Sequence, residues 1–177
     1  FGGILARICV LGVGLTINYF AAFLLASSIA FYIFIYTVWL KRRTHHNIVI
    51  GGAAGAFPPV IGWSCVTGDI SILPFMLFLI IFVWTPPHFW ALAMYKDVEY
   101  SKVNIPMLPV VHGRKVAKIQ SFIYSLVLSL VSIAPFFIGL TGELYLFSSI
   151  VLNLIFVFYS YKLLNSKKNE NDIFASR

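Results

Sequence analysis

Residues 71–95 read SILPFMLFLIIFVWTPPHFWALAMY and contain no Asp, Glu, Lys or Arg. A transmembrane helix needs roughly 20 consecutive apolar residues, so this run is long enough to cross a bilayer. The charged sequence KDVEYSK follows directly at residues 96–102. The run therefore predicts a membrane-spanning helix that ends at a polar segment.

The rest of the chain repeats this pattern. Its 177 residues are 60% hydrophobic and 11% charged, whereas a soluble domain is about one quarter charged. A soluble core of this size could not bury so much apolar surface. We therefore predict an all-α, multi-pass transmembrane helical bundle formed by a single domain, residues 1–177. The expected spans cover about residues 1–16, 18–40, 47–66, 71–95, 118–139 and 143–164.

Lysine and arginine gather where alternate spans end. The net charge is +7, and nearly all basic residues lie at positions 41–43, 96–118 and 162–177. The turns at residues 18, 67–69 and 139–143 contain none. By the positive-inside rule, the basic loops should face the cytoplasm or matrix across an inner membrane, bacterial in preference to mitochondrial. A nucleic-acid-binding protein would gather such charges on one soluble face, so we expect a bilayer and no nucleic acid.

Two prolines, Pro86 and Pro87, lie near the end of the 71–95 run. A proline within a transmembrane helix frees a carbonyl group and kinks the helix, which is tolerated where neighbours or water satisfy that group. Beside the ionisable ring of His88, they favour the wall of a cavity. The alternative is an aromatic belt at the membrane surface. The aromatic residues here are Trp84, Phe89 and Trp90.

Two polar segments are expected on the basic membrane face. The first combines Asp97 and Glu99 with Lys102, a mixture that suits Mg²⁺ holding a phosphate-containing anion. The alternative for this segment is a solvated loop with weak surface ion pairs. The second segment contains Lys41, Arg42 and Arg43, followed by His45 and His46. Adjacent side chains on a helix diverge, so we do not expect the two histidines to share a metal ion.

The span at residues 47–66 has its own features. Gly51, Gly52 and Gly55 should let it approach a neighbouring helix closely. Pro58 and Pro59 should break it near its middle, as in spans that line a site.

Three stretches closely resemble the UbiA-type intramembrane prenyltransferases, specifically the branch that acts on heme B. They are YTVWLKRRTHHNIVIGGAAGAFPPVIGW at 36–63, WTPPHFWALA at 84–93 and NIPMLPVV at 104–111. The resemblance implies a bundle of nine transmembrane helices, of which this chain holds the third to eighth and is truncated at both ends. It also implies transfer of farnesyl from farnesyl diphosphate to a vinyl group of heme B, giving heme O for terminal oxidases.

The resemblance further implies Mg²⁺ and two acidic motifs, of which the first would precede Phe1 and the second surrounds Glu99. The family usually has Asp-Tyr where this chain has Glu99-Tyr100, so either Asp97 or Glu99 is expected to bind the metal. Without the first motif, the 177 residues alone are expected to be inactive. Stabilisation of the diphosphate is assigned to Lys41, Arg42, Arg43, Tyr100 and Lys102.

The remaining implied site residues concern the two apolar substrates. The prenyl cation would be shielded by Trp84, Phe89 and Trp90. His88 would contact heme B as an iron ligand, as a propionate partner, or only by orienting the kink. Thr44 and Asn47 are expected as polar contacts near the mouth of the site. Heme A synthase or terminal oxidase assembly factors are candidate partners.

Two other readings compete with this one. A UbiA-type enzyme that prenylates a quinone or chlorophyll precursor would share the fold. A transporter or non-catalytic assembly protein would also show kinked spans with an interior histidine, but it would release no diphosphate and need no Mg²⁺.

Overall fold

The computed structural model describes residues 1–95 and 105–166, and these contain helices and connecting turns but no strands. The helices are α1 (Gly2–Thr16), α2 (Tyr19–Ala30), the π-helix η1 (Phe31–Leu40), α3 (Asn47–Ala56), α4 (Pro58–Thr67), α5 (Ile72–Tyr95), α7 (Leu108–Val111), α8 (Gly113–Phe137) and α9 (Glu143–Asn165).

The predicted all-α class is confirmed for the described residues, as are five of the six expected spans. Five helical stretches are long and apolar enough to cross a membrane, at 19–40, 47–67, 72–95, 113–137 and 143–165, and α1 is a shorter apolar helix. The chain is therefore that of a multi-pass integral membrane protein. One boundary differs, because α8 begins at Gly113 rather than near residue 118. Its first turns contain Arg114, Lys115 and Lys118, which lengthen the helix at its polar end.

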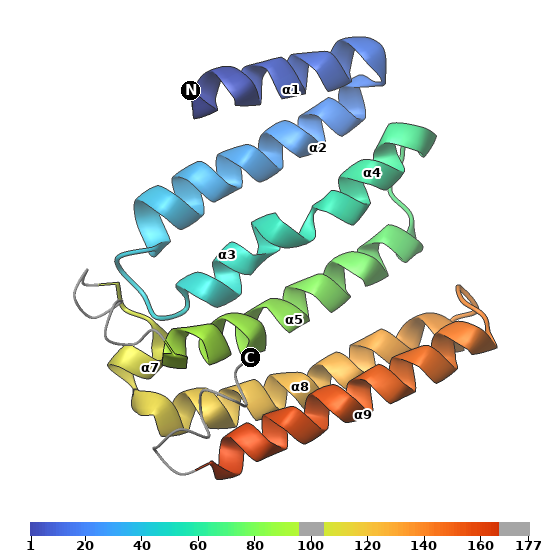
Figure 1. Cartoon of the computed structure of the whole chain (residues 1–177). Helices are drawn as coiled ribbons and strands as arrows, with labels where there is room; N and C mark the ends of the chain where they lie inside the picture. The colour runs from blue at the N-terminus through green and yellow to red at the C-terminus, as the bar shows by residue number, and fades with distance from the viewer. Residues whose placement is uncertain (96–104, 167–177) are drawn as a thin grey trace.

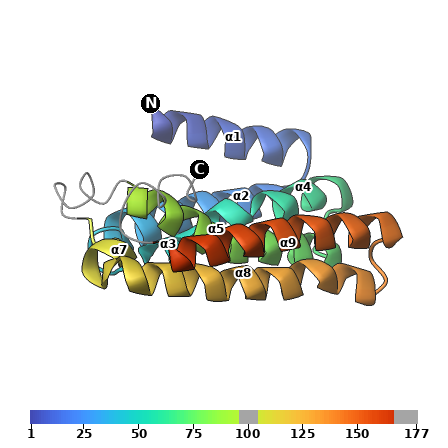
Figure 2. The same cartoon turned by 60° about the horizontal axis from the view of Figure 1, so that its bottom comes forward.

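The spans lie side by side in sequence order, each antiparallel to the one before (Figure 1). η1 continues α2, and α4 continues α3, so each pair forms one span. The turn at residues 41–46, α7 and the end of α9 consequently lie at the same end of the bundle. In Figure 2, α1 lies off the layer formed by the other helices and packs against α2.

The opposite end of the bundle is held by Asn18. Its side-chain oxygen accepts a hydrogen bond from the backbone N–H of Ala21 (2.7 Å) and so caps α2. Its side-chain amide donates to the carbonyl of Ser64 in α4 (2.8 Å). One polar side chain therefore ends a turn and joins two neighbouring spans.

The α8–α9 interface is built from small and polar side chains, while large apolar side chains point outward. Exposed residues of α9 include Leu144, Phe147 and Leu152, as expected for a surface that faces lipid. Within the interface, Asn153 donates to the Ser132 hydroxyl (2.6 Å). Small residues let two helices approach, and hydrogen bonds between them add stability where the surroundings contain no water. The buried polar residues are Ser121, Ser125 and Ser132 of α8 and Ser149, Asn153 and Ser160 of α9.

The α3–α4 span shows both features expected of it. α3 ends at Ala56 and α4 begins at Pro58, although Phe57 between them keeps helical dihedral angles (φ −67°, ψ −27°). The break is therefore a local loss of hydrogen bonds rather than a change of direction. A Cβ at Gly52 would lie 2.9 Å from the Thr85 Cγ2, so this glycine allows α3 to approach α5. A Cβ at Gly55 would meet nothing within 4 Å.

We expect Gly52→Ala to destabilise the protein relative to Gly55→Ala. Both substitutions gain the same helix propensity, so the difference isolates the clash with Thr85. Overpacking of this kind costs about 1–3 kcal/mol. The two variants should be compared by thermal unfolding of the purified protein in detergent. Equal midpoints would show that α3 and α5 are not in close contact here.

Helix α5 continues through Pro86 and Pro87 to Tyr95. Neither proline can donate a backbone hydrogen bond, so the carbonyls of Phe82 and Val83 lose their usual partners. The Thr85 hydroxyl donates to the carbonyl of Ile81 (2.7 Å) in the same turn. The two prolines thus loosen the helix without ending it.

Candidate functional site

An apolar cavity of about 890 Å³ lies among α1, α2, η1, α3 and α5. Its wall includes Tyr32 and Tyr36 of η1, and Trp84 and Phe89 of α5. The hydroxyls of two lining residues already donate to backbone carbonyls, from Thr85 to Ile81 and, at 3.4 Å, from Ser28 to Ala54. The cavity therefore offers mainly hydrocarbon surface. Its volume falls within the roughly 300–1,000 Å³ usual for small-molecule sites.

A cavity wall was predicted around Pro86, Pro87 and His88, but none of these three residues is among those that line the cavity. Trp84 and Phe89 line it, and His88 lies between them in sequence. The His88 ring stacks on the Trp84 indole (centroids 4.4 Å apart, planes at 18°) and meets the Phe89 ring edge-on at 5.4 Å. The side chain of His88 is exposed. Its ring is thus packed against two neighbouring aromatic rings and remains accessible.

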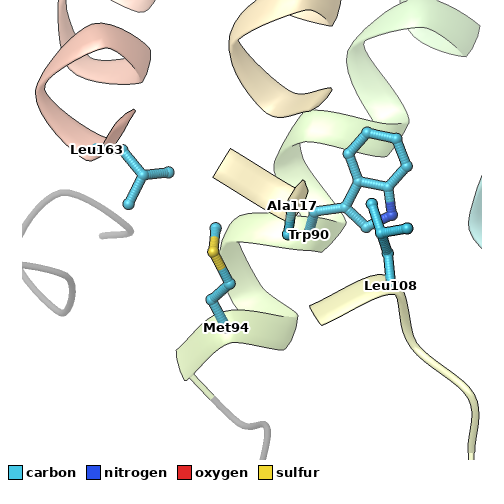
Figure 3. Packing of buried hydrophobic residues seen from close by; sticks show 5 residues of the cluster. All are labelled: Trp90, Met94, Leu108, Ala117 and Leu163. Carbon is cyan, nitrogen blue, oxygen red and sulfur yellow. The ribbon is translucent and has the colours of Figure 1, made fainter. Parts of the chain in front are cut away.

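Trp90 takes a different position from the other two aromatic residues. Only 3% exposed, it packs in a cluster with Met94 of α5, Leu108 of α7, Ala117 of α8 and Leu163 of α9 (Figure 3). Its indole N–H has no hydrogen-bond partner within the described residues. Successive residues on a helix point about 100° apart, and here Phe89 lines the cavity while Trp90 turns into the cluster.

This cluster joins the polar ends of α5, α7, α8 and α9. Arg114, in the first turn of α8, donates to the carbonyl of Met94 at 2.9 Å, near the end of α5. Lys118 is buried, and its amino group donates to the Ser166 hydroxyl (2.7 Å) and carbonyl (3.1 Å) at the end of α9. A cation at the C-terminal end of a helix also interacts favourably with the helix dipole. The ends of α5 and α9 are thus both tied to the first turns of α8.

The basic turn, residues 41–46, is held from both sides. The Lys41 N–H donates to the carbonyl of Tyr36 (2.8 Å). The carbonyl of Lys41 accepts from the Asn47 side chain (3.1 Å). Asn47 is fully buried, and its side-chain oxygen has no hydrogen-bond partner within the described residues. The Thr44 hydroxyl accepts from the His46 N–H (3.2 Å). Asn47 and Thr44 therefore shape the turn, whereas the exposed side chains of Arg42 and Arg43 reach solvent.

His45 and His46 lie in this turn rather than on a helix, so their rings do not diverge as expected. The ring centroids are 4.0 Å apart, and His112 approaches His45 to 4.3 Å from the start of α8. Partial burial lowers the pKa of His45 below its ordinary value of 6.5, and the charges of His46 and His112 lower it further. Lys41, Arg42, Arg43 and Arg114 add fixed positive charge to this end. The folded state thus favours a neutral His45.

Acid is expected to loosen this contact. A lowered pKa means that the unfolded turn binds the proton more tightly, so the contact is complete above pH 6.5 and is lost as the pH falls through the lowered value. Amide hydrogen exchange, corrected for intrinsic rate, should show reduced protection at residues 44–47 near about pH 5. His45→Gln should remove most of this change. Equal protection at neutral and acid pH would contradict the expectation.

The predicted metal-binding segment lies outside the described residues. This applies to Asp97, Glu99, Tyr100 and Lys102. Within residues 1–95 and 105–166, no three His, Cys, Asp or Glu side chains lie close enough to hold a metal ion. Asp69 and Glu143, the acids in these ranges, lie in the turns opposite the basic end.

Several residues of the cavity were not foreseen from the sequence. Tyr32 and Tyr36 belong to a run of uniformly apolar and aromatic residues, in which no periodicity indicates a π-helix. The glycines at 51 and 52 were expected to allow close contact, and they do so with Tyr36 and Thr85. The signal that could have found Tyr36 is its position five residues before the basic turn.

Comparison with known proteins gives a consistent result. The model of the UbiA prenyltransferase family matches residues 1–176. A protein named protoheme IX farnesyltransferase from Parvibaculum lavamentivorans is 55% identical over 91% of this chain and 51% of its own length. Proteins of the same name from Acidiphilium cryptum and Novosphingobium aromaticivorans are 50% and 52% identical, over 100% and 97% of the chain and 56% and 57% of their own lengths. The chain thus spans about half the length of these curated relatives. No solved structure matches it.

Proposed function

Because the chain belongs to the UbiA prenyltransferase family, we propose that the complete protein containing it is a heme O synthase. It transfers the farnesyl group of farnesyl diphosphate to a vinyl group of heme B. The observation that carries this proposal is the apolar cavity, which reaches from the middle of the bundle toward the basic turn. The names of the relatives support the choice of substrates.

The cavity and the turn suit the two halves of a prenyl diphosphate. The hydrocarbon chain lies against the apolar wall, where Trp84 and Phe89 are exposed to it. The diphosphate lies at the basic end, within reach of Arg42 and Arg43. Charge-assisted hydrogen bonds from guanidinium groups to phosphate are among the strongest that proteins make. Apolar contacts thus recognise the prenyl end of the substrate, and positive charges recognise its diphosphate end.

The same arrangement favours the reaction. The allylic C–O bond breaks, and its electron pair leaves with the diphosphate. Negative charge on the leaving group increases as the bond breaks, so Lys41, Arg42, Arg43 and Lys102 stabilise it more strongly in the transition state than in the ground state. Tyr100 donates a hydrogen bond to the departing oxygen. These residues accelerate the first step by stabilising the leaving group with charge and a hydrogen bond.

The cationic farnesyl carbon is then attacked by the π electrons of the heme vinyl group. A new C–C bond forms, and positive charge moves to the carbon next to the porphyrin. Water adds there and loses a proton, giving the hydroxyethylfarnesyl group. Until that point the cavity excludes water, and the faces of Trp84 and Phe89 stabilise the cation. His88, stacked on Trp84, contacts the heme from the cavity edge.

Asp97 and Glu99 are the carboxylates at this end that would hold Mg²⁺, which when bound neutralises charge on the diphosphate. Their donor chemistry fits the ion, since oxygen ligands close to phosphate are what Mg²⁺ prefers. The basic loops face the cytoplasm or matrix of an inner membrane, bacterial in preference to mitochondrial. Heme A synthase or terminal oxidase assembly factors receive the product.

The test is a transfer assay with the complete purified protein. Farnesyl diphosphate, heme B and Mg²⁺ should yield heme O, detected by liquid chromatography and mass spectrometry, and a chelator should stop it. Substituting an aromatic quinone precursor for heme B should yield no product. Prenylation of the quinone precursor would favour the other branch of the family. Absence of diphosphate release with every acceptor would favour a transport or assembly role.

A further inference from the structure

The ring of Tyr36 lies directly on the backbone of α3 at Gly51. A Cβ at Gly51 would lie 2.6 Å from the Tyr36 Cε2 and 3.0 Å from its Cγ, and closer still to Cδ2. No side chain other than hydrogen fits between that ring and the helix. The Tyr36 ring therefore packs against the helix backbone at Gly51, and the missing side chain there fixes the position of the ring.

The π-helix η1 places the Tyr36 ring against Gly51. The hydrogen bond from the Lys41 N–H to the Tyr36 carbonyl spans five residues, and such wide turns are frequent at functional sites. The Tyr32 ring packs against Tyr36 with centroids 5.3 Å apart. Together these contacts hold the Tyr36 ring between a neighbouring ring and the glycine.

Tyr32, Tyr36 and Gly51 all line the apolar cavity. A ring displaced from Gly51 therefore moves into the cavity volume. From this geometry we propose that Tyr36, packed against Gly51, determines the length of the prenyl chain that the cavity accepts. This inference rests on the proposed function, since it concerns the prenyl diphosphate of the same site. Tyr36 determines specificity for chain length as part of the cavity wall, and it takes no part in bond breaking.

Gly55 provides a matched control. It lies one helical turn after Gly51, lines the same cavity, and has open space where a Cβ would be added. Gly51→Ala and Gly55→Ala thus add the same methyl group to the same helix beside the same cavity. They differ in whether that methyl displaces the Tyr36 ring.

The experiment measures kcat/KM of the complete protein for geranyl, farnesyl and geranylgeranyl diphosphate with heme B. Gly51→Ala should lower the farnesyl-to-geranyl ratio by about tenfold or more, the usual effect of misfitting even one methylene in an apolar pocket. Gly55→Ala adds a methyl group beside the same cavity without displacing the Tyr36 ring, so it should change the ratio less than Gly51→Ala does. Tyr36→Ala should raise the use of geranylgeranyl diphosphate, and Gly51→Ala combined with Tyr36→Ala should recover farnesyl use because the clash is gone.

A second readout separates this inference from the proposed function. Equilibrium binding of geraniol, farnesol and geranylgeraniol, followed by tryptophan fluorescence, requires no heme and no turnover. If the protein lacks heme-farnesylating activity, the function fails while the order of alcohol affinities still tests Tyr36. If Gly51→Ala destabilises the protein, Tyr36→Ala carries the test. Equal chain-length preference in Gly51→Ala and Gly55→Ala, or an unchanged preference in Tyr36→Ala, would overturn the inference.

Discussion

Replacing Arg42 and Arg43 together with glutamine is expected to lower kcat/KM for farnesyl diphosphate about 100-fold or more. A hydrogen bond to a charged group contributes about 1.5–3 kcal/mol, and two such bonds to phosphate would be lost. Both side chains are exposed at the end of η1, where they can reach a ligand without breaking a structural contact. The substitution should therefore affect catalysis far more than folding.

The turn that carries these charges is fixed by hydrogen bonds to its backbone. Its backbone wraps around the end of η1, since the N–H groups of Arg43 and Thr44 both donate to the carbonyl of Leu40 (3.0 and 3.2 Å). The buried Asn47 side chain then holds the carbonyl of Lys41. Because the turn is fixed before substrate binds, the positive charges need little reorganisation when the diphosphate leaves.

Lys162→Gln is the matched control for this prediction. Lys162 is exposed in the last turn of α9, at the same end of the bundle, and the proposed reaction does not use it. Its neutralisation should change kcat/KM by less than about threefold, which is the size of a screened surface effect. Comparable losses in the two variants would mean that the turn acts only through the overall charge of this face. The affinity for heme B should be unchanged in both.

The membrane spans could be predicted from the sequence because two independent signals agree. Apolar runs long enough to cross a bilayer are separated by turns that alternate between basic and uncharged, so length and charge give the same boundaries. The start of α8 was placed too late because Arg114, Lys115 and Lys118 look like loop residues. In the structure they occupy the polar end of the helix, where Arg114 and Lys118 hydrogen-bond to α5 and to the residue after α9.

The site was only partly predictable, for a different reason. The resemblance assigned Trp84 and Phe89 to shielding of the prenyl cation, and both line the cavity. Trp90 was grouped with them by proximity in sequence, but its helical position turns it into the cluster with Met94 and Leu108. Tyr36 depends on a π-helix and on a glycine in another helix, a pairing that exists only after packing. Sequence motifs therefore locate the site, whereas the packing of the helices determines which neighbouring side chains line it.

Replacing His88 with alanine is expected to weaken heme B binding about tenfold or more while leaving KM for farnesyl diphosphate unchanged. Loss of an iron ligand or of a charge-assisted bond to a propionate would remove about 1.5–3 kcal/mol. The side chain of His88 is exposed, and within the described residues it makes ring contacts with Trp84 and Phe89 but no hydrogen bond. Heme titration followed by the Soret band measures the effect.

Metal-free protoporphyrin IX separates the roles of His88, because it keeps the propionates and lacks the iron. If the imidazole binds iron, His88→Ala should lose affinity for heme B and shift its Soret band, with no change for the metal-free ring. If it contacts a propionate, both ligands should lose affinity equally. His88→Phe is the control, since it keeps a ring to stack on Trp84 but supplies no nitrogen. Full heme affinity in His88→Phe would reduce His88 to a packing role and contradict the prediction. A loss that matches His88→Ala would assign the effect to the imidazole nitrogen, the one feature that stacking on Trp84 leaves unused.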